Sequence, residues 1–328
     1  MIISKTPLRA SFFGGGSDFK DYFEKSTLGY GQVLSAALDM HVYITVNKKF
    51  DDKIRVVYNG NELVDNVDEL KHNIIREALK LTGLTKGIEV IYMADIPLST
   101  AGIGLASSSA LAVGVLNALH AYKGEYVTQE VLAKEACQIE IDLLGQRIGI
   151  QDQYAVSYGG FKRYRFLNDG TVNITPLIID GKTRNSLYNN IMLFFTGNTR
   201  DSRKILSEQS DNIENKRKML DDLVLTVDKV YEELNKNNID IVGSELNRTW
   251  QIKKSLSSGI SNELIDNMYN AAISAGAIGG KILGAGGGGF MLLYVKDDNK
   301  AKVREALKDY REIPFKVDSE GSRIIFVD

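Results

Sequence analysis

The chain has 328 residues, of which 44% are hydrophobic and 25% charged, and its formal net charge is −2. This composition is typical of an ordinary globular protein, and the length predicts about two domains. The small net charge offers no basic field to nucleic acid or to an anionic membrane, and no run of about 20 apolar residues suggests a membrane span, so we expect neither partner.

The first half of the chain alternates strand and helix patterns. Runs rich in β-branched and aromatic residues predict strands over residues 41–50, 53–58, 87–94, 161–166 and 171–179. Apolar periodicity and capping residues predict helices over 68–83, 108–122 and 128–145. The helix over 108–122 is apolar nearly all round, so we expect it to be buried.

The polar segment 180–190 reads as turns and suggests a boundary between an N-terminal domain, residues 1–187, and a C-terminal domain, residues 188–328. The second domain opens with a predicted strand at 191–197, a charged helix over 201–238 and a helix near 262–277. Apolar strands then flank a glycine-rich loop, and a short helix and a closing strand at 322–328 follow.

The numbers of cysteines and histidines limit which disulfides and metal sites the chain can form. The single cysteine, Cys137, argues against a disulfide framework and for a reducing, cytoplasmic compartment. Three scattered histidines argue against zinc and leave a hard cation on oxygen ligands as the favoured metal. The sequence carries no signal for an oligomeric state.

The stretch KILGAGGGGF, residues 281–290, contains five glycines between two apolar strands. A flexible linker would have polar flanks, so this loop is a turn, a place where backbone approaches a ligand closely, or both. Its glycines Gly286 and Gly287 are candidate nucleotide contacts.

The stretch GIGLASSSA, residues 102–110, follows a strand and opens the apolar helix. Its glycines turn backbone N–H groups toward an anion, the helix N-terminus adds unpaired donors, and a serine hydroxyl could bind Mg²⁺. This pattern predicts a phosphate site, with a serine-capped helix after a turn as the alternative. Ser107 stands where a dinucleotide fingerprint needs its third glycine, which argues against a nicotinamide dehydrogenase.

Carboxylates complete the candidate site. In PLRASFFGGGSDF, residues 7–19, Asp18 follows a glycine loop and could bind sugar hydroxyls, or it could cap the next helix. Glu140 and Asp152 lie across a helix end, where one could hold a metal and the other could accept a proton. Taken alone, both would be interpreted as surface acids.

Together, these segments resemble the GHMP superfamily of small-molecule kinases, which includes galactokinase, homoserine kinase and mevalonate kinase. Three signatures occur in the family order, at residues 7–19, 102–110 and 281–290, and GIQDQ falls where the family has its catalytic aspartate. The resemblance runs from Pro7 to the end of the chain. It implies a two-domain α+β fold, with an N-terminal domain like ribosomal protein S5 domain 2 and a ferredoxin-like C-terminal domain, and it implies ATP and Mg²⁺.

The resemblance also assigns roles residue by residue. Asp152 aligns with the base, Arg9 with the basic residue near the transferred phosphoryl group, and Glu140 and Ser108 with Mg²⁺ ligands; Ser107 or Ser109 replaces Ser108 if the register is off by one. The implied nucleotide contacts are Gly102, Gly104, Leu105, Ala106, Ser107, Ser108, Ser109, Gly286 and Gly287. The implied sugar contacts are Gly15, Gly16, Ser17 and Asp18. Ala106 replaces a glycine common in the family, a change that a right-handed backbone there would tolerate.

Within the family, FFGGGSD, QDQYA, GAGGGGFM and EGSRIIFVD are similar to kinases of D-glycero-D-manno-heptose 7-phosphate. That similarity implies phosphorylation of the anomeric C1 hydroxyl on the route to nucleotide-activated heptose for surface polysaccharide. The second phosphate requires cations, for which Arg163, Arg165, Arg200 and Arg203 are candidates. Two alternatives remain: a kinase for fucose, galactose or mannose, and a catalytically silent sugar and ATP sensor.

Overall fold

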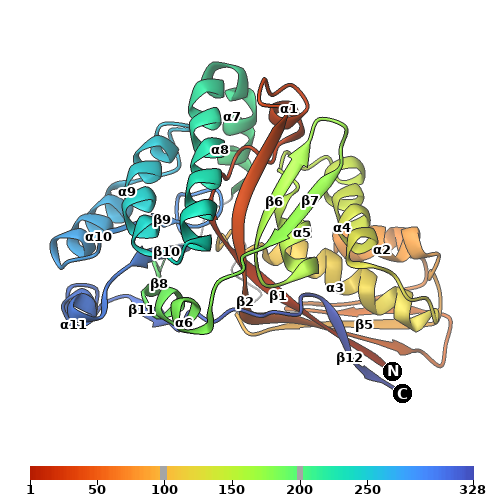
Figure 1. The fold of residues 1–328 in the computed structure, drawn as a ribbon. Helices are drawn as coiled ribbons and strands as arrows, with labels where there is room; N and C mark the ends of the chain where they lie inside the picture. Colours follow the sequence, from red (N-terminus) through yellow and green to blue (C-terminus); the bar gives the residue numbers. More distant parts are fainter. Residues whose placement is uncertain (97–101, 198–201) are drawn as a thin grey trace.

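Two β-sheets organise the chain in the computed structural model, which describes residues 1–96, 102–197 and 202–328. Within these residues, the larger sheet has the strand order β12-β1-β2-β5-β3-β4, and β6 and β7 extend it from β2 (Figure 1). Its strands are β1 (Ile2–Phe13), β2 (Tyr30–Lys48), β3 (Ile54–Val57), β4 (Asn61–Val64), β5 (Ile88–Ala94), β6 (Phe161–Leu167), β7 (Val172–Pro176) and β12 (Arg323–Val327).

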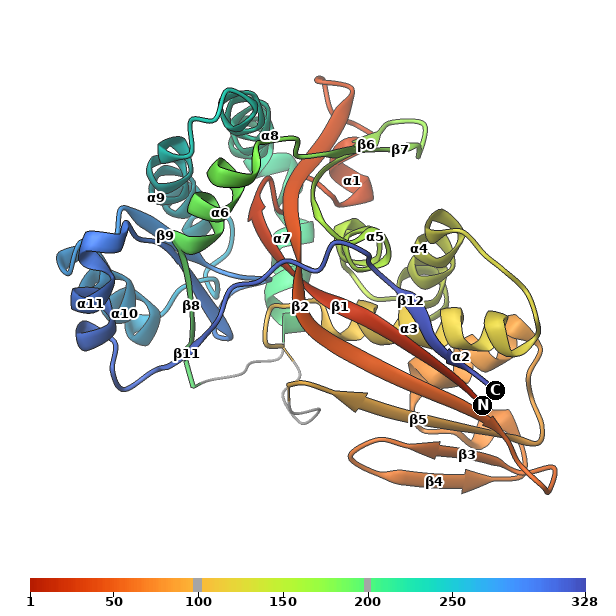
Figure 2. The ribbon, with the colours of Figure 1, turned by 60° about the horizontal axis from the view of Figure 1, so that its bottom comes forward.

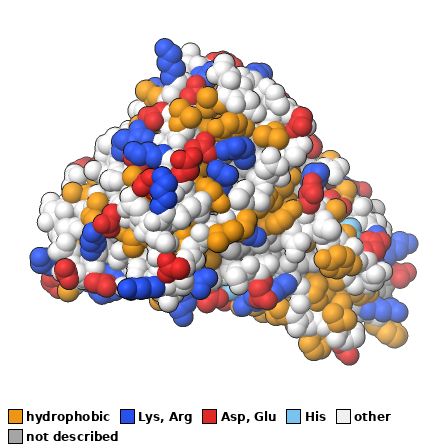
Figure 3. Space-filling model, in the orientation of Figure 1, with side chains coloured by type: hydrophobic (Ala, Val, Ile, Leu, Met, Phe, Trp, Pro, Cys, Tyr) orange, Lys and Arg blue, Asp and Glu red, His pale blue; other side chains and the backbone are white. Residues whose placement is uncertain are grey.

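The smaller sheet is antiparallel throughout and has the order β11-β8-β10-β9. Its strands are β8 (Ile191–Phe195), β9 (Gly279–Ile282), β10 (Phe290–Tyr294) and β11 (Arg311–Ile313). Its layer contains the helices α8 (Ile213–Asn235), α9 (Asp240–Lys254), α10 (Glu263–Ser274) and α11 (Asp297–Ala306), with α7 (Ser202–Asp211) beside α8. On the face shown in Figure 3, basic and acidic side chains are interspersed over both layers.

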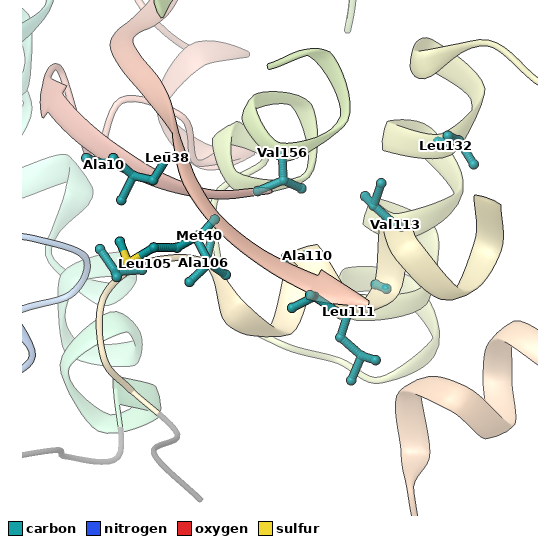
Figure 4. Packing of buried hydrophobic residues seen from close by; sticks show 14 of the residues in the cluster. Ala10, Leu38, Met40, Leu105, Ala106, Ala110, Leu111, Val113, Leu132 and Val156 are labelled. Carbon is teal, nitrogen blue, oxygen red and sulfur yellow. The ribbon is translucent and has the colours of Figure 1, made fainter. Parts of the chain in front are cut away.

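Helix α3 (Ser107–Tyr122) is the centre of the larger layer. It packs on β1 and β2 and contacts α2 (Asn73–Thr82), α4 (Gln129–Cys137) and α5 (Gln151–Tyr158). Its apolar side chains are buried on nearly every face, as predicted. Figure 4 shows the resulting core, formed by Ala10, Leu38, Met40, Leu105, Ala106, Ala110, Leu111, Val113, Leu132 and Val156.

Several predicted elements have different bounds in the structure. The helix predicted over 128–145 begins at a Thr128 cap, then widens into π-helical turns over Gln138–Leu143. The helix predicted from Asp68 begins only at Asn73, after a short 3₁₀ turn at Val67–Glu69, although it does end at Gly83. The charged helix is two helices, because Asn212 leaves helical geometry between α7 and α8.

In the second half, one prediction was wrong and one helix was not predicted. Residues 180–190 are not turns: Asp180 accepts a hydrogen bond from the Thr183 N–H at 2.9 Å and caps the helix α6 (Gly181–Asn189). The polar side chains that suggested turns lie on its solvent side, and Leu187 is its buried anchor. Helix α9 was missed entirely.

The end of the chain returns to the larger sheet. The last strand, β12, pairs antiparallel with β1, so that Ile2 lies opposite Val327 (Figure 2). The two sheets therefore do not divide the chain at a single point. The boundary predicted at 187/188 assigns β12 to the C-terminal domain, although β12 pairs with β1 in the larger sheet.

A buried contact between a histidine and an aspartate anchors this return. His41 Nε2 lies 2.8 Å from Asp318 Oδ2, and the N–H groups of Glu320 and Gly321 each donate to Asp318 Oδ1 at 2.9 Å. Burial alone would raise the pKa of the Asp318 carboxyl. The hydrogen bonds from His41, these two N–H groups and Arg323 outweigh burial and hold that pKa well below its usual value.

We expect Asp318→Asn to lower the free energy of unfolding by about 3–5 kcal/mol at neutral pH, because it leaves the partners of a buried charge unpaired. A carboxyl with a lowered pKa stabilises the fold above its unfolded pKa of about 3.9 and loses that effect as pH falls through the folded value. The difference in free energy of unfolding between the wild type and Asp318→Asn should therefore become smaller in strong acid. Urea unfolding at several pH values measures it.

The matched control is Asp39→Asn, since Asp39 also lies near His41 but is 49% exposed. Exposed ion pairs contribute about 0–1 kcal/mol. Equal losses in the two variants would contradict the assigned role of Asp318.

Candidate active site

A cavity of about 670 Å³ lies where the two layers meet. Three remote segments line it: Gly15, Gly16 and Asp18 after β1, residues 102–104 and 106–109 before and within α3, and Gly284 with Ala285 after β9. Arg9, Glu140 and Asp152 line the same cavity. The structure thus brings together most of the residues that the sequence singled out.

The loop before α3 is built to expose backbone donors. Gly102 and Gly104 both have φ of +80°, and the Arg9 N–H donates to Leu105 O at 3.0 Å, which ties the loop to β1. Helix α3 begins at Ser107 without a side-chain cap, so its first N–H groups remain available to an anion. Leu105 contributes backbone only, since its side chain is fully buried.

The backbone at Ala106 is not the right-handed one that would tolerate alanine in place of glycine. Ala106 has φ of 63° and ψ of 36°, a left-handed conformation that costs an L-residue about 1–2 kcal/mol. The cause is local: the chain is fixed to β1 at Leu105 and must turn directly into α3 one residue later. The strain lies at the edge of the cavity, where strained backbone is common in functional sites.

The glycine loop after β9 packs against this first loop. A Cβ on Gly284 would lie 2.4 Å from Gly104 Cα, and a Cβ on Gly289 would lie 2.2 Å from Ile103 O. Only glycines permit this contact between two backbones. Gly286 and Gly287 do not line the cavity and lie against the backbone of Ile260. The glycine run is therefore a turn that supports the loop before α3, with Gly284 and Ala285 as the residues at the cavity wall.

Asp152 and Arg9 form a bidentate ion pair inside the cavity. Arg9 Nε and Nη2 lie 2.8 Å from Asp152 Oδ1 and Oδ2, and Arg9 Nη1 donates to Gly104 O at 2.6 Å. A β-bulge between Pro7 and Leu8 re-aims β1 just before Arg9. The guanidinium is buried while the carboxylate is 25% exposed, so the acid remains accessible to a ligand.

Glu140 lies on the π-helical turns, with its carboxylate facing the start of α3. It accepts hydrogen bonds from the hydroxyls of Ser108 and Ser109 and from Gln153 Nε2 at 2.6 Å. Burial raises the pKa of this carboxyl, and the three hydrogen bonds act against that rise. A buried carboxylate beside an exposed hydroxyl, that of Ser108, offers the oxygen ligands that Mg²⁺ prefers.

Asp18 lies beside Asp152 rather than at a helix cap. Its carboxylate accepts from the Gly16 N–H at 2.9 Å and from Gln151 Nε2 at 3.0 Å, and helix α1 (Lys20–Phe23) has no side-chain cap. Burial and then the charge of Asp152 raise the pKa of Asp18. Ser17 does not reach the cavity, because its hydroxyl is bonded to Gly14 O and Gln32 O.

Arg163 and Arg165, two of the arginines predicted to hold a substrate phosphate, do not line the cavity. Arg163 and Arg165 both bond to Asp228, and their guanidinium groups lie over the rings of Tyr231 and Tyr30. Arg200 lies outside the described residues, and the side chain of Arg203 is not described either.

Two buried lysines at the cavity were missed by sequence reasoning. Lys281 interrupts the apolar run GGKIL of β9, a signal that was present in the sequence. Lys253 continues the buried face of α9. That helix, although unpredicted, places Val242, Leu246, Trp250 and Lys253 at helical spacing.

No helix within the described ranges combines the length and the apolarity needed to cross a membrane. Two family models match the chain: GHMP kinases N terminal domain over residues 70–160 and GHMP kinases C terminal over residues 230–312. Both fall within the layers that border the cavity.

Similar proteins agree with these models. A D-glycero-alpha-D-manno-heptose 7-phosphate kinase of Campylobacter jejuni is 30% identical over 321 residues, which cover 94% of this chain and 93% of that protein. A bifunctional fucokinase/GDP-fucose pyrophosphorylase of Arabidopsis thaliana is 26% identical over 95% of this chain and 31% of that longer protein. The crystal structure of a D-glycero-D-manno-heptose 1-phosphate kinase from Bacteroides thetaiotaomicron has the same fold, with a TM-score of 0.82, 23% identity and full coverage of both chains. The predicted fold and family are confirmed: the chain belongs to the GHMP kinase family and is a sugar kinase that transfers phosphate from ATP.

Proposed function

We propose that this sugar kinase phosphorylates the anomeric C1 hydroxyl of D-glycero-D-manno-heptose 7-phosphate, yielding the 1,7-bisphosphate for nucleotide-activated heptose and surface polysaccharide. The observation that carries the proposal is the Arg9–Asp152 pair, held between the loop before α3 and the loop that contains Asp18. Similarity to the Campylobacter jejuni enzyme over nearly the whole chain supports the choice of substrate.

In this proposal, Asp152 accepts the proton of the anomeric hydroxyl while that oxygen attacks the γ-phosphorus of ATP in line. The bond from the γ-phosphorus to the bridging oxygen breaks, and ADP leaves. Arg9 offsets the negative charge that develops on the transferred group. Asp18 accepts hydrogen bonds from neighbouring sugar hydroxyls, and the backbone at Gly15 and Gly16 borders the sugar.

The nucleotide phosphates would bind the N-terminal turn of α3, at residues 106–109. The apolar end of the cavity, which contains Ile74, Tyr92, Ile96 and Leu111, offers a surface for the base. Ser108 and Glu140 would hold Mg²⁺, which neutralises charge on the phosphates when bound.

Glu140→Gln should raise the Mg²⁺ concentration for half-maximal activity by at least about 10-fold, because the amide lacks the anionic oxygen. It should also stabilise the ligand-free protein near pH 7. A carboxyl whose pKa is raised by burial destabilises the fold increasingly as pH rises above its unfolded value, and the amide removes this cost. The gain should fade toward acidic pH. Coupled ADP-release assays and thermal unfolding measure both effects.

Glu130→Gln is the control, since Glu130 is exposed and pairs with Lys134 on the surface of α4. A Glu140→Gln enzyme with a normal Mg²⁺ requirement would remove Glu140 from the metal site.

The substrate is tested by incubating the protein with ATP–Mg²⁺ and heptose 7-phosphate and recording ³¹P NMR spectra. The expected result is a new anomeric phosphate signal together with ADP. A parallel ADP-release panel contains fucose, galactose, mannose and their phosphates, since a fucokinase is among the similar proteins. Faster turnover of an unphosphorylated sugar would reassign the substrate, and ATP binding without any ADP release would indicate a silent sensor.

A further inference from the structure

Two lysine side chains that the proposed mechanism does not use are buried at the cavity. Lys253 comes from the last turn of α9 and Lys281 from β9, and they are 9% and 6% exposed. Both line the cavity that holds Asp18 and Asp152. Lysine is almost never this deeply buried unless a partner compensates its charge.

The hydrogen bonds of these ammonium groups are incomplete. Lys253 Nζ donates to Ile282 O at 3.1 Å and to Gly284 O at 2.6 Å, and Lys281 Nζ donates to Phe12 O at 3.0 Å. An ammonium group has three donors. By these contacts, one N–H of Lys253 and two of Lys281 remain for a further acceptor.

Neither ammonium has a carboxylate within ion-pair distance among residues 1–96, 102–197 and 202–328. Burial and then the charge of Arg9 lower the pKa of Lys253 to about 7. Burial, Lys253 and Arg9 together hold the pKa of Lys281 well below its usual value. Asp18 is the acid that acts in the opposite direction on both. A second anion beside Lys253 and Lys281 would stabilise their charged forms and so offset the cost of burying them.

An unpartnered hydroxyl lies in the same region. Ser11 is 4% exposed and lines the cavity, and its Oγ has no hydrogen-bond partner in the described part of the chain. Ser11 precedes Phe12, whose carbonyl binds Lys281, and a Cβ on Gly15 would lie 3.6 Å from Ser11 Oγ. Ser11 and the ammonium of Lys281 therefore lie at the end of β1, beside the loop of Asp18, and Lys253 is close enough for its charge to lower the pKa of Lys281.

We propose that Lys253, Lys281 and Ser11 form a subsite for a phosphate ester carried by the acceptor sugar. The proposal rests on the proposed function and replaces the arginines as ligands of the second phosphate. Position favours the acceptor over the nucleotide: Lys281 and Ser11 adjoin the loop of Asp18, whereas the N–H groups available to the nucleotide phosphates lie at the start of α3. A phosphate dianion supplies the missing negative charge, and its oxygens accept hydrogen bonds from both ammonium groups and from the Ser11 hydroxyl.

The direct test is a binding measurement without turnover. The protein is saturated with Mg²⁺ and a non-hydrolysable ATP analogue, so that the nucleotide site is filled, and inorganic phosphate is titrated by calorimetry. Lys281→Met and Lys253→Met should each weaken phosphate binding by about 10- to 100-fold, as expected for loss of a charge-assisted hydrogen bond. Lys254→Met is the matched control, because Lys254 is the next residue of α9 and pairs with Asp266 outside the cavity.

A second readout separates binding from a merely structural role. The wild-type protein should take up protons when phosphate binds near neutral pH, which appears as a calorimetric enthalpy that depends on the buffer. Arg9, Asp18 and the two lysines are the charged groups that set this uptake. Lysines that only support the glycine loop would show no such uptake. Phosphate affinity unchanged in both Met variants, or absent in the wild type, would overturn the proposal.

Kinetics then distinguish the source of the phosphate. Lys281→Met should raise KM for heptose 7-phosphate by about 10- to 100-fold and leave KM for ATP within about twofold. A rise confined to ATP would assign the lysines to the nucleotide and overturn the subsite. If no heptose 7-phosphate is turned over by the wild type, the proposed function fails, while the phosphate titration still decides whether the subsite exists.

Discussion

Asp152→Asn should lower kcat by about 10² to 10⁴, the usual contribution of a general base, and leave ATP binding intact. An amide is almost isosteric with the carboxylate, but it cannot accept the proton of the sugar hydroxyl. It also loses half of the bidentate contact with Arg9, whose two bonds of 2.8 Å orient the acid in the wild type. Steady-state ADP release and fluorescence titration with a nucleotide analogue measure the two properties separately.

Asp142→Asn provides the matched control, because Asp142 is 58% exposed and contacts Lys20. It should behave like the wild type. A kcat within a factor of about three for Asp152→Asn would exclude proton transfer to this residue, and a loss of ATP affinity equal to the loss of kcat would indicate collapse of the site instead.

Gly284→Ala should reduce kcat/KM for ATP by about 100-fold, comparable to other cases in which reacting groups are displaced by about 1 Å. The new methyl group would lie 2.4 Å from Gly104 Cα. Either the loop before α3 or the loop after β9 must therefore move. Gly104 O also accepts the hydrogen bond from Arg9, and this movement would disturb the Arg9–Asp152 pair. Circular dichroism establishes that the variant remains folded.

Gly83→Ala isolates the steric effect from backbone strain. Gly83 has φ of +73°, close to the +68° of Gly284, but a Cβ there meets no atom within 4 Å. Both substitutions force alanine into left-handed backbone at a cost of about 1–2 kcal/mol, and only one creates an overlap. Equal kinetics for the two variants would show that contact between the glycine loops is not needed for catalysis.

Sequence reasoning located the parts of the site that are local in the chain. Glycine-rich loops next to strands and a helix start have few structural solutions, so residues 15–18, 102–109 and 281–290 are recognisable from the amino-acid pattern alone. Glu140 and Asp152 followed from the resemblance to a kinase family. The proximity of these segments was an expectation that the cavity now supports.

The remaining features depend on contacts between distant residues. Lys253 and Ser11 carry no local pattern that points to a ligand, and their meaning comes only from the cavity they share. Arg163 was misassigned because its partner, Asp228, lies 65 residues away on α8. The left-handed backbone of Ala106 was not predicted, because it is set by the hydrogen bond between Arg9 N–H and Leu105 O. The residue pattern within one segment contains no information about such contacts between distant segments.

The return of the chain to its first sheet limits how the enzyme can open. The second layer is joined to the first through α6 before β8 and again through residues 314–318 after β11, where Asp39 N–H bonds to Lys316 O and Asp318 N–H to Ala37 O. Two covalent connections allow less relative movement of the two sheets than one would. Helix α8 restricts that movement further, because it packs directly on β1 and β2.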